Sequence, residues 1–314
     1  MNHLITGGAG FIGSELIDYL LENTNNSVIC MDNFQSGSKS NLSNAINNPR
    51  FDLIRHDVCE PIRLEVDRIW HLACVASPNR YQTNPIATTK TNVLGTMNML
   101  GLAKRCGARM LFTSTSEVYG DPEISPQPES YLGNVNNIGV RSCYDEGKRL
   151  AESLCFDYLR IHNVDVKVAR IFNTYGPRLR TDDGRVISNF INQSIHGEPL
   201  TIYGDGSQTR SFCYIDDLIQ GLSLLMNSSC VGPINLGNPE EISINYLAEL
   251  VSELSNKTLK VVYRELPNDD PCRRCPDISR AIEELHWSPK VSLRDGLSFT
   301  IRSLRSRSEA AMIG

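Results

Sequence analysis

The stretch TGGAGFIG occupies residues 6–13 and lies between a short apolar run and a segment with helical periodicity. Its glycines are spaced GxxGxxG. Gly7 permits a tight turn, Gly10 lets the backbone approach a pyrophosphate, and Gly13 permits close contact between helix and strand. The helix that follows begins with free N–H groups and the positive end of its dipole, which favour a bound anion. In this order of strand, turn and helix, the pattern predicts a dinucleotide-binding site.

An acidic residue stands where such a site needs one. Asp32 ends the apolar run Val28–Met31, about twenty residues beyond the last glycine. A carboxylate at this point accepts hydrogen bonds from the adenosine ribose hydroxyls and repels a 2′-phosphate, so NAD is favoured over NADP. The alternative interpretation is that Asp32 only begins a turn with Asn33. Asp57 follows the next apolar run and is predicted to receive the adenine amino group.

Apolar runs alternate with helical patterns over about the first 170 residues, which predicts an α/β fold with a Rossmann-type, doubly wound parallel sheet. After Asn173 the sequence becomes rich in turn residues. We therefore expect an NAD-binding domain over residues 1–174, to which about 210–236 return, a smaller C-terminal substrate-binding lobe over 175–305, and a frayed tail over 306–314. The predicted strands are His3–Thr6, Val28–Met31, Phe51–Ile54, Arg68–Leu72, Arg109–Thr113 and Val166–Arg170, and the predicted helices are Ile12–Asn23, Thr88–Cys106 and Tyr144–Leu159.

The composition excludes several classes of function. A formal net charge of −5 provides no basic field, so we expect no nucleic-acid partner. No apolar run reaches the ~18 residues of a membrane span, and the opening MNHLITGG lacks the features of a signal peptide. The ten cysteines stand mostly in apolar runs, which indicates a reducing compartment. We therefore expect a soluble cytoplasmic protein without membrane contact. Cys272 and Cys275 form a lone CxxC without a second ligand pair, so no metal site is predicted.

Tyr144 and Lys148 stand at positions i and i+4 of a predicted helix, and therefore on one helix face. The lysine ammonium and a positively charged nicotinamide both favour the phenolate of Tyr144. The phenolate can then take a proton from a hydroxyl whose carbon loses a hydride. Lys148 can also hold the nicotinamide ribose. The pair predicts hydride-transfer chemistry.

Hydroxyl side chains follow the predicted strand at Arg109–Thr113. The carboxyl end of a parallel strand opens into the crevice in which such folds bind ligands. Thr115 and Ser116 are therefore predicted to donate hydrogen bonds to a substrate oxygen beside Tyr144. The alternative is ordinary capping of a turn by Ser and Thr.

Together these motifs resemble the extended short-chain dehydrogenase/reductase family over nearly the whole chain. The resemblance rests on TGGAGFIG, DNF, HLA, TSTSEVYG, YDEGK and RIFNTYGP. Within that family the chain is most similar to the UDP-glucuronate decarboxylases (UDP-xylose synthases), through TSTSEVYGDPE, CYDEGKRLAE, ARIFNTYGPR, DGRVISNF and YGDGSQTRSF.

The chain departs from two sister groups at one point. The sugar-nucleotide 4,6-dehydratases carry an Asp–Glu pair that expels the C6 hydroxyl and deprotonates C5, whereas this chain has Ser116-Glu117. Glu117 alone can position the sugar or order a water. The UDP-glucose 4-epimerases usually have a small residue at the Glu117 position. The chain also departs from the decarboxylases that it resembles, because Ala73-Cys74-Val75 stands where the first of their two Ala-Ser-Pro repeats is found.

The resemblance implies the remaining site residues. Arg274 matches an arginine that faces the substrate carboxylate, although a solvated loop cation is the alternative. Glu117 completes the catalytic set with Tyr144, Lys148, Thr115, Ser116 and Arg274. The implied cofactor set adds Phe11, Ile12, Asn33, Phe34, Val58, Leu72 and Ala73 to Gly7, Gly10, Gly13, Asp32, Asp57, Tyr144 and Lys148. The implied substrate set is Ser77, Tyr81, Asn173, Arg178, Arg185, Tyr203, Gln208, Arg210 and Arg274.

The activity implied is conversion of UDP-glucuronate to UDP-xylose through a 4-keto intermediate, with NAD recycled in the site and the UDP-sugar as partner. A UDP-sugar or UDP-uronate 4-epimerase and a sugar-nucleotide 4,6-dehydratase are the enzymatic alternatives. An NAD-sensing regulatory protein is the non-enzymatic one, although such proteins often lose the Tyr or Lys that this chain retains. The resemblance also implies a homodimer, paired through the helices Thr88–Cys106 and Tyr144–Leu159.

Overall fold

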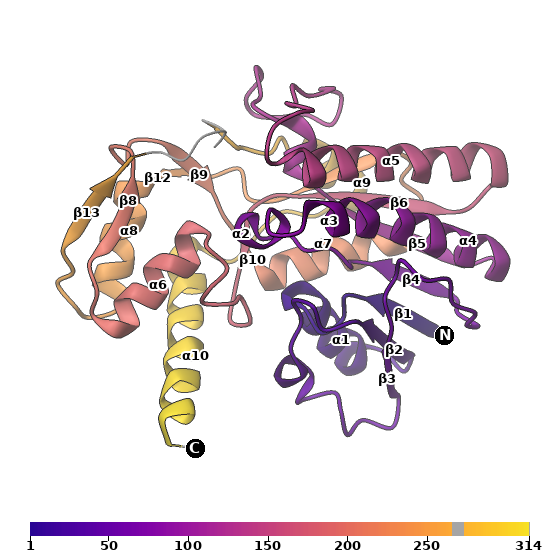
Figure 1. Ribbon diagram of the computed structural model, residues 1–314, viewed down its shortest axis with the longest axis horizontal. Helices are drawn as coiled ribbons and strands as arrows, with labels where there is room; N and C mark the ends of the chain where they lie inside the picture. Colours follow the sequence, from indigo (N-terminus) through magenta and orange to yellow (C-terminus); the bar gives the residue numbers. More distant parts are fainter. Residues whose placement is uncertain (266–272, 314) are drawn as a thin grey trace.

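A seven-stranded sheet forms the centre of the computed structural model, which describes residues 1–265 and 273–313 (Figure 1). The strands run in the order β11-β6-β5-β4-β1-β2-β3, and every neighbouring pair is parallel. Because all strands point the same way, their carboxyl ends meet at one edge of the sheet. Their bounds are β1 (Asn2–Thr6), β2 (Ser27–Asp32), β3 (Phe51–Arg55), β4 (Arg68–His71), β5 (Arg109–Thr115), β6 (Val166–Ile171) and β11 (Pro233–Leu236).

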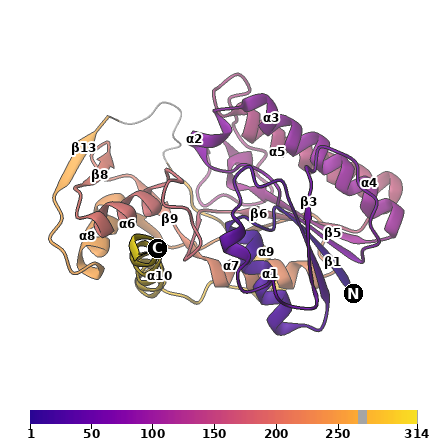
Figure 2. The same cartoon turned by 60° about the horizontal axis from the view of Figure 1, so that its bottom comes forward.

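Helices cover both faces of this sheet (Figure 2). Both faces of the central strands are therefore buried, as the continuous apolar runs predicted. One face carries α3 (Pro85–Lys90), the π-helical segment η2 (Thr91–Gly95), α4 (Thr96–Cys106) and α5 (Ser142–His162). The other face carries α1 (Phe11–Asn23), α7 (Ile215–Asn227) and α9 (Ser279–Leu285). Three short helices lie in the connections between these elements: η1 (Lys39–Leu42), α2 (Pro78–Tyr81) and η3 (Ser116–Tyr119). The predicted fold class is confirmed.

The helix predicted from Thr88 begins earlier, at Pro85. Asn84 caps it, because its side-chain oxygen accepts a hydrogen bond from the Ala87 N–H at 3.1 Å. Proline at the first helical position lacks an N–H that would have no partner there. The helical path then continues without a break through η2 into α4.

A smaller lobe stands beside the carboxyl edge of the sheet (Figure 1). Its strands pair over long sequence distances, β8 with β13 and β9 with β12. The lobe contains α6 (Val186–His196), β8 (Leu200–Tyr203), β9 (Thr209–Ser211), β12 (Glu241–Ser243), α8 (Ile244–Leu254), β13 (Val261–Arg264) and α10 (Leu293–Ile313). The pair β7 (Thr174–Tyr175) and β10 (Cys213–Tyr214) connects it to the sheet.

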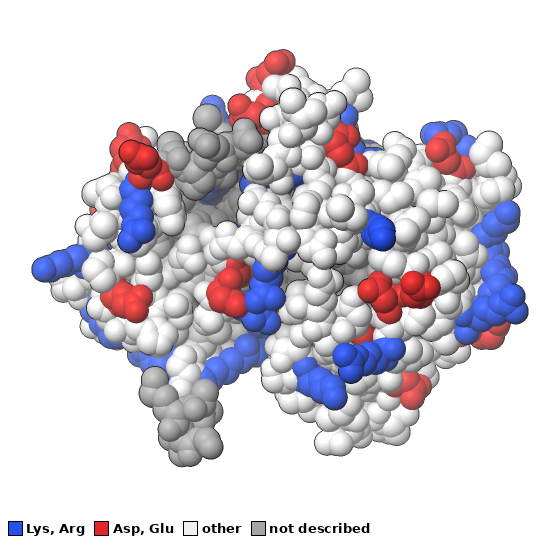
Figure 3. Space-filling view, viewed as in Figure 1, with Lys and Arg blue, Asp and Glu red and all other residues white. Residues whose placement is uncertain are grey.

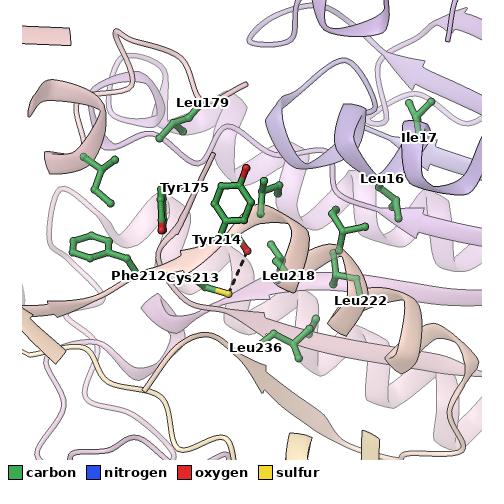
Figure 4. Close-up of a cluster of buried hydrophobic side chains, with 14 of the residues drawn as sticks. Leu16, Ile17, Tyr175, Leu179, Phe212, Cys213, Tyr214, Leu218, Leu222 and Leu236 are labelled. Carbon is green, nitrogen blue, oxygen red and sulfur yellow. Dashed lines mark hydrogen bonds between the residues drawn. The ribbon is translucent and has the colours of Figure 1, made fainter. Parts of the chain in front are cut away.

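One apolar core joins the lobe to the sheet (Figure 4). Leu16 of α1, Leu218 of α7 and Leu236 of β11 belong to the same buried cluster as Phe212 and Leu250 of the lobe. Burial of this shared surface stabilises the lobe against the sheet at roughly 25 cal/mol per Å².

The frayed tail predicted over 306–314 is wrong for residues 306–313, because α10 continues to Ile313. Arg307 anchors this helix by donating a hydrogen bond to the Pro177 carbonyl at 3.1 Å. Among the described residues, none of the helices combines the length and the apolar character that crossing a membrane requires. On the face in Figure 3, cationic and anionic side chains are interspersed.

Candidate active site

A cavity of about 1270 Å³ lies at the carboxyl edge of the sheet and extends to the lobe. This volume exceeds the 300–1,000 Å³ that is usual for one small ligand, so the cavity can hold two. The residues following β1, β2, β4, β5 and β6 all reach it. The sequence-predicted residues that line it are Gly7, Gly10, Phe11, Ile12, Gly13, Asp32, Asn33, Val58, Leu72, Ala73, Ser77, Tyr81, Thr115, Ser116, Glu117, Tyr144, Lys148, Asn173, Arg178, Arg185, Tyr203, Gln208, Arg210 and Arg274.

The glycine-rich turn is too tight for side chains. Gly7 has a φ of +69°, and a Cβ there would lie 2.9 Å from backbone atoms of Ala73. A Cβ on Gly13 would lie 2.3 Å from the Gly7 carbonyl oxygen. The turn and the first helical residues are therefore packed backbone against backbone, which leaves the N-terminus of α1 open to a phosphate.

Asp32 is held in place by the turn that it faces. Its carboxylate accepts hydrogen bonds from the Ala9 N–H at 2.9 Å and from the Phe34 N–H at 2.7 Å. Burial raises the pKa of this carboxyl, and the two backbone hydrogen bonds oppose the rise. The side chain is buried but lines the cavity, so it can still accept hydrogen bonds from a ribose.

Two residues of the predicted cofactor set lie outside the cavity lining. The oxygens of Asp57 are engaged by the Asn33 side chain at 3.0 Å and the Cys59 N–H at 2.9 Å. Asp57 thus orients Asn33, which does line the cavity. Phe34 has a φ of +62°, and the hydrogen bond of its N–H to Asp32 maintains that conformation.

Tyr144 and Lys148 both lie on the inner face of α5 and are almost fully buried. The Lys148 ammonium donates to the Thr113 carbonyl at 2.8 Å and lies 4.7 Å from the ring centre of Phe112. These contacts fix the ammonium at the end of β5. Burial lowers the pKa of Lys148.

The ring of Tyr144 stacks on Tyr81, with centroids 5.0 Å apart and planes inclined by 5°. Burial raises the pKa of Tyr144 well above its usual value, and a hydrogen bond with Thr115 opposes that rise. Thr115 also accepts the Glu117 N–H at 3.2 Å, as the capping alternative predicted. The hydroxyl proton of Thr115 nevertheless remains free to be donated toward the phenol oxygen.

Glu117, which was expected to position the sugar or order a water, is held by two cationic side chains. Its carboxylate lies between two guanidinium groups, that of Arg274 on one side and that of Arg141 on the other. Arg274 engages both oxygens, and Arg141 engages one of them. Arg274 is therefore a buried ion-pair residue, and the solvated-cation alternative is wrong.

Sequence reasoning missed Arg141 and Asp145. Arg141 lines the cavity at the N-terminus of α5, and its Nε lies 3.7 Å from the Asp145 carboxylate. Burial, followed by the negative charge of Glu117, raises the pKa of Asp145 to about 7. The available signal was position, because the two residues flank Tyr144 within one turn of the same helix.

Residues 178–185, here called the strap, all line the cavity. Ser77 donates to the Asp183 carbonyl at 2.7 Å, and Arg80 pairs with Asp182 at 2.7 Å. On the other side, Arg180 donates to the Ser36 carbonyl at 3.4 Å. The strap therefore contacts the connections that follow β2 and β4.

The predicted substrate residues of the strap and lobe are mostly engaged within the protein. Arg185 forms a two-point pair with Asp183, and Arg178 pairs with Asp18 of α1 at 2.5 Å. Gln208 donates to the Tyr203 carbonyl at 2.6 Å, while Tyr203 itself is 39% exposed. These contacts fix the positions of the arginine side chains on the strap and lobe side of the cavity.

Among the described residues, no group of three or more His, Cys, Asp or Glu side chains is placed to hold a metal ion. Cys275 is buried, and its sulfur lies 3.3 Å from the Pro239 carbonyl oxygen. Cys272, the other half of the CxxC, lies outside the described residues.

Comparison with known proteins places these features in a family. Residues 3–237 match the model of the NAD dependent epimerase/dehydratase family. UDP-glucuronic acid decarboxylase 3 of Arabidopsis thaliana is 61% identical over 307 residues, which cover 98% of this chain and 90% of that protein. UDP-glucuronic acid decarboxylase 1 of Xenopus tropicalis is 54% identical over 306 residues, which cover 98% of this chain and 72% of that protein.

Among solved structures, UDP-glucuronic acid 4-epimerase from Bacillus cereus, in complex with UDP-glucuronic acid and NAD, is similar throughout. It is 31% identical, superposes with a TM-score of 0.89, and matches 98% of this chain and 100% of that one. The likeness of fold thus extends over both the sheet and the lobe.

Proposed function

The chain belongs to the NAD dependent epimerase/dehydratase family, and we propose that it decarboxylates UDP-glucuronate to UDP-xylose, with NAD recycled in the site. Relatives of that activity are 54–61% identical over nearly the whole chain. The observation that carries the proposal is that a buried phenol, Tyr144, and a buried guanidinium, Arg274, line one cavity. Oxidation at C4 needs a base, and the sugar carboxylate needs a cation.

The residues at the sheet edge fit NAD. The glycine turn leaves its backbone N–H groups accessible, since a Cβ at Gly7 or Gly13 has no room. Asp32 is oriented to accept hydrogen bonds from the ribose hydroxyls. Lys148 lies one helical turn after Tyr144, with its ammonium at the end of β5. NAD, when bound, supplies an acceptor and a donor for hydride. The other catalytic functions belong to the protein.

Tyr144 takes the proton from the C4 hydroxyl and later returns it. Burial raises the pKa of Tyr144, so the phenol needs nearby positive charge before it can act as a base. Lys148 supplies such a charge one helical turn away, and its ammonium is fixed by the Thr113 carbonyl. The Thr115 hydroxyl stabilises the phenolate further.

Decarboxylation follows from the ketone at C4. The carboxylate on C5 is β to that ketone, so the bond between C5 and the carboxyl carbon breaks and its electron pair forms an enolate. Tyr144 and a hydroxyl of Thr115 or Ser116 stabilise the charge on the C4 oxygen. C5 then takes a proton from a water held near Glu117. With the bound cofactor as hydride donor, reduction at C4 would give UDP-xylose, while Tyr144 returns its proton to the C4 oxygen.

The nucleotide-sugar extends from Tyr144 toward the lobe. Arg274 faces the C5 carboxylate, because an arginine fork matches a planar anion. Asn173 and Arg210 lie toward the diphosphate, with Arg185 in the same pocket, and Tyr203 lies toward the uracil. All of them line the same cavity as Tyr144, which supports this placement.

Product analysis tests the proposal. The purified protein is incubated with UDP-glucuronate labelled at the carboxyl carbon and with NAD, and carbon dioxide and the nucleotide-sugars are measured. We expect labelled carbon dioxide and UDP-xylose in equal amounts. UDP-galacturonate with the label retained would instead identify a 4-epimerase, and accumulation of a 4-keto pentose with NADH would mean that the return step is missing. Binding of NAD without conversion of the sugar would indicate a regulatory protein.

We also propose a homodimer paired through α4 and α5. The two helices contact each other, and their outer surfaces expose Met97, Leu150 and Ile161. A second copy of the chain would cover these apolar side chains. Sedimentation of the wild type and of Leu150→Glu tests this proposal. We expect the wild type to be a dimer and Leu150→Glu to be a monomer, and a monomeric wild type would refute the proposed dimer.

We propose a cytoplasmic location, which the free thiols of all nine described cysteines support.

A further inference from the structure

The Glu117 carboxylate is shared between two arginines that come from different parts of the fold. Arg274 belongs to the segment after β12 and α8, and both of its terminal nitrogens engage Glu117. Arg141 is the N-cap residue of α5 and engages Glu117 from the other side. Glu117 and Arg274 are over nine-tenths buried, and the side chain of Arg141 is 15% exposed. The three side chains all line the cavity beside Tyr144.

This arrangement raises a problem for the proposed function, on which the inference rests. Arg274 is to face the substrate carboxylate, yet its fork is already filled by Glu117. Among the residues that the structure describes, its buried Nε has no hydrogen-bond partner. The two terminal nitrogens can form an end-on, two-point pair with a second carboxylate only if they release the first. If Arg274 were its only cationic partner, Glu117 would then be a buried anion without a partner, which is strongly unfavourable.

Arg141 removes that difficulty. We propose that Arg141 is a positioning residue that retains Glu117 when Arg274 transfers its fork to the substrate carboxylate. Glu117 occupies the fork in the absence of substrate, and the uronic acid displaces it. Because Arg141 keeps its own bond to Glu117, the displaced carboxylate keeps a cationic partner. On Arg274, the substrate carboxylate replaces the Glu117 carboxylate, and each buried charge keeps a partner of opposite sign throughout.

The local structure explains why Arg141 remains bound to Glu117. Its carbonyl accepts the N–H groups of Tyr144 at 2.9 Å and Asp145 at 3.1 Å, so its backbone is part of the first turn of α5. Its Nε faces the Asp145 carboxylate at 3.7 Å. One guanidinium thus lies between two carboxylates, a geometry that a lysine point charge cannot reproduce fully.

Arg274 is held differently. The Arg274 carbonyl accepts the Ser211 hydroxyl at 3.1 Å, and the following N–H, of Cys275, donates to the Gln127 side chain at 2.9 Å. These bonds fix its backbone and leave the long side chain to turn between partners. The two arginines therefore have separate functions: one retains Glu117, and the other binds the sugar.

Binding measurements with two ligands test the inference. NAD-loaded Tyr144→Phe protein, in which turnover is expected to be slowed at least about 100-fold, is titrated with UDP-glucuronate and with UDP-xylose, which lacks the carboxylate. The same titrations are made after adding Arg141→Gln, Arg141→Lys or, as a control, Arg149→Gln. Arg149 is matched to Arg141 because it lies on the same helix and donates to the Val118 carbonyl, next to Glu117, without pairing with Glu117.

We expect Arg141→Gln to weaken binding of UDP-glucuronate at least about tenfold and binding of UDP-xylose less than threefold. Arg141→Lys should recover part of the difference, and Arg149→Gln should affect both ligands equally. Equal weakening of both ligands by Arg141→Gln, or no weakening, overturns the inference. An absence of carbon dioxide release by the unmodified enzyme would instead refute the proposed function.

A crystal structure keeps the inference testable if Arg141→Gln fails to fold. In the complex of Tyr144→Phe with NAD and UDP-glucuronate, we expect Arg274 on the sugar carboxylate and Glu117 still on Arg141. A complex in which Arg274 retains both bonds to Glu117 would overturn the inference. So would one in which Glu117 has left Arg141.

Discussion

At the scale of single residues, the phenol of Tyr144 is the group that must gain and lose a proton. Tyr144→Phe keeps the ring that stacks on Tyr81 but removes the acid–base oxygen. We expect kcat for carbon dioxide release to fall at least about 100-fold, with the affinity for UDP-glucuronate changed only a few-fold. Tyr158→Phe is the control, since Tyr158 lies on the outer part of the same helix and contacts His162. A Tyr144→Phe enzyme with wild-type kcat would contradict the role of the phenol.

Asp145 makes the stability of the fold depend on pH. Its pKa is about 7 rather than 3.8, because burial and the charge of Glu117 outweigh the attraction of Arg141 and Arg274, with Glu146 adding to the rise. The folded chain therefore binds this proton more tightly than the unfolded chain does. The resulting stability is complete below about pH 4 and is lost as pH rises through about 7.

Asp145→Asn removes this titration. Between pH 5 and pH 8 we expect wild type to lose stability relative to Asp145→Asn, by an amount on the order of a few kcal/mol at most. Urea unfolding at both pH values measures the difference. Asp157→Asn, at an exposed position of the same helix, should show no such trend. A constant difference between wild type and Asp145→Asn across this range would show that Asp145 keeps an ordinary pKa.

The residues that the sequence identified are those whose relation is local. Tyr144 and Lys148 are one helical turn apart, and spacing alone predicts their shared face. The partners of Glu117 are not local: Arg141 is 24 positions away and Arg274 is 157. Only the fold brings them together, so Arg141 had no signal in the sequence beyond its place before Tyr144.

At the scale of elements, the connection between η3 and α5 supports the site through Gln127. This side chain is fully buried, accepts the Cys275 N–H at 2.9 Å and donates to the Ile124 carbonyl at 2.9 Å. We expect Gln127→Leu to lower kcat by displacing Arg274, and to lower the free energy of unfolding by about 1–3 kcal/mol, because the N–H loses its partner.

Gln193→Leu is the matched control. Gln193 likewise accepts a backbone N–H, that of Thr201, and its amide donates to the Thr201 hydroxyl, but it connects α6 to β8 away from Arg274. It should lower stability without a comparable loss of kcat in the folded enzyme. Steady-state kinetics and chemical unfolding of both variants separate the two effects. Equal losses of kcat would mean that Gln127 does not act through Arg274.

Elements were predictable where their pattern is long. Six of the seven strands of the main sheet were placed to within two residues, because each contains an apolar run. The seventh, β11, was not predicted as a strand and was covered only by the expectation that about 210–236 return to the NAD-binding domain. The lobe was interpreted only as turn-rich. Its strands β9 and β12 have three residues each and pair across about thirty positions, and such short segments carry no periodicity of their own. The continuation of α10 to Ile313 was likewise missed. It is supported by a tertiary contact, the hydrogen bond from Arg307 to the Pro177 carbonyl, which the local sequence pattern does not reveal.

At the scale of the whole molecule, the strap over 178–185 links the two sides of the cavity mouth. Its outer contact is the exposed pair between Arg80 and Asp182. Exposed pairs contribute about 1 kcal/mol at most, so we expect Arg80→Gln to speed release of bound NADH up to about fivefold. Displacement of NADH fluorescence by excess NAD measures the rate.

Arg105→Gln is the control for that measurement. Arg105 forms a similarly exposed pair with Glu65, at 2.7 Å, and neither residue lines the cavity. Release of NADH should therefore be unchanged in this variant. An unchanged rate in Arg80→Gln as well would mean that the strap does not limit exchange of the cofactor.

The apolar interior that runs without interruption from α1 and α7 into the lobe has a consequence for protein engineering. Exchanging residues 175–305 for those of a relative would cut through one packed interior rather than along a seam, and mismatched side chains on the two sides would leave voids or clashes. Chimeras made at that boundary should precipitate or unfold. Ligand preference in this scaffold is better redirected by altering individual side chains around the cavity than by transplanting the lobe.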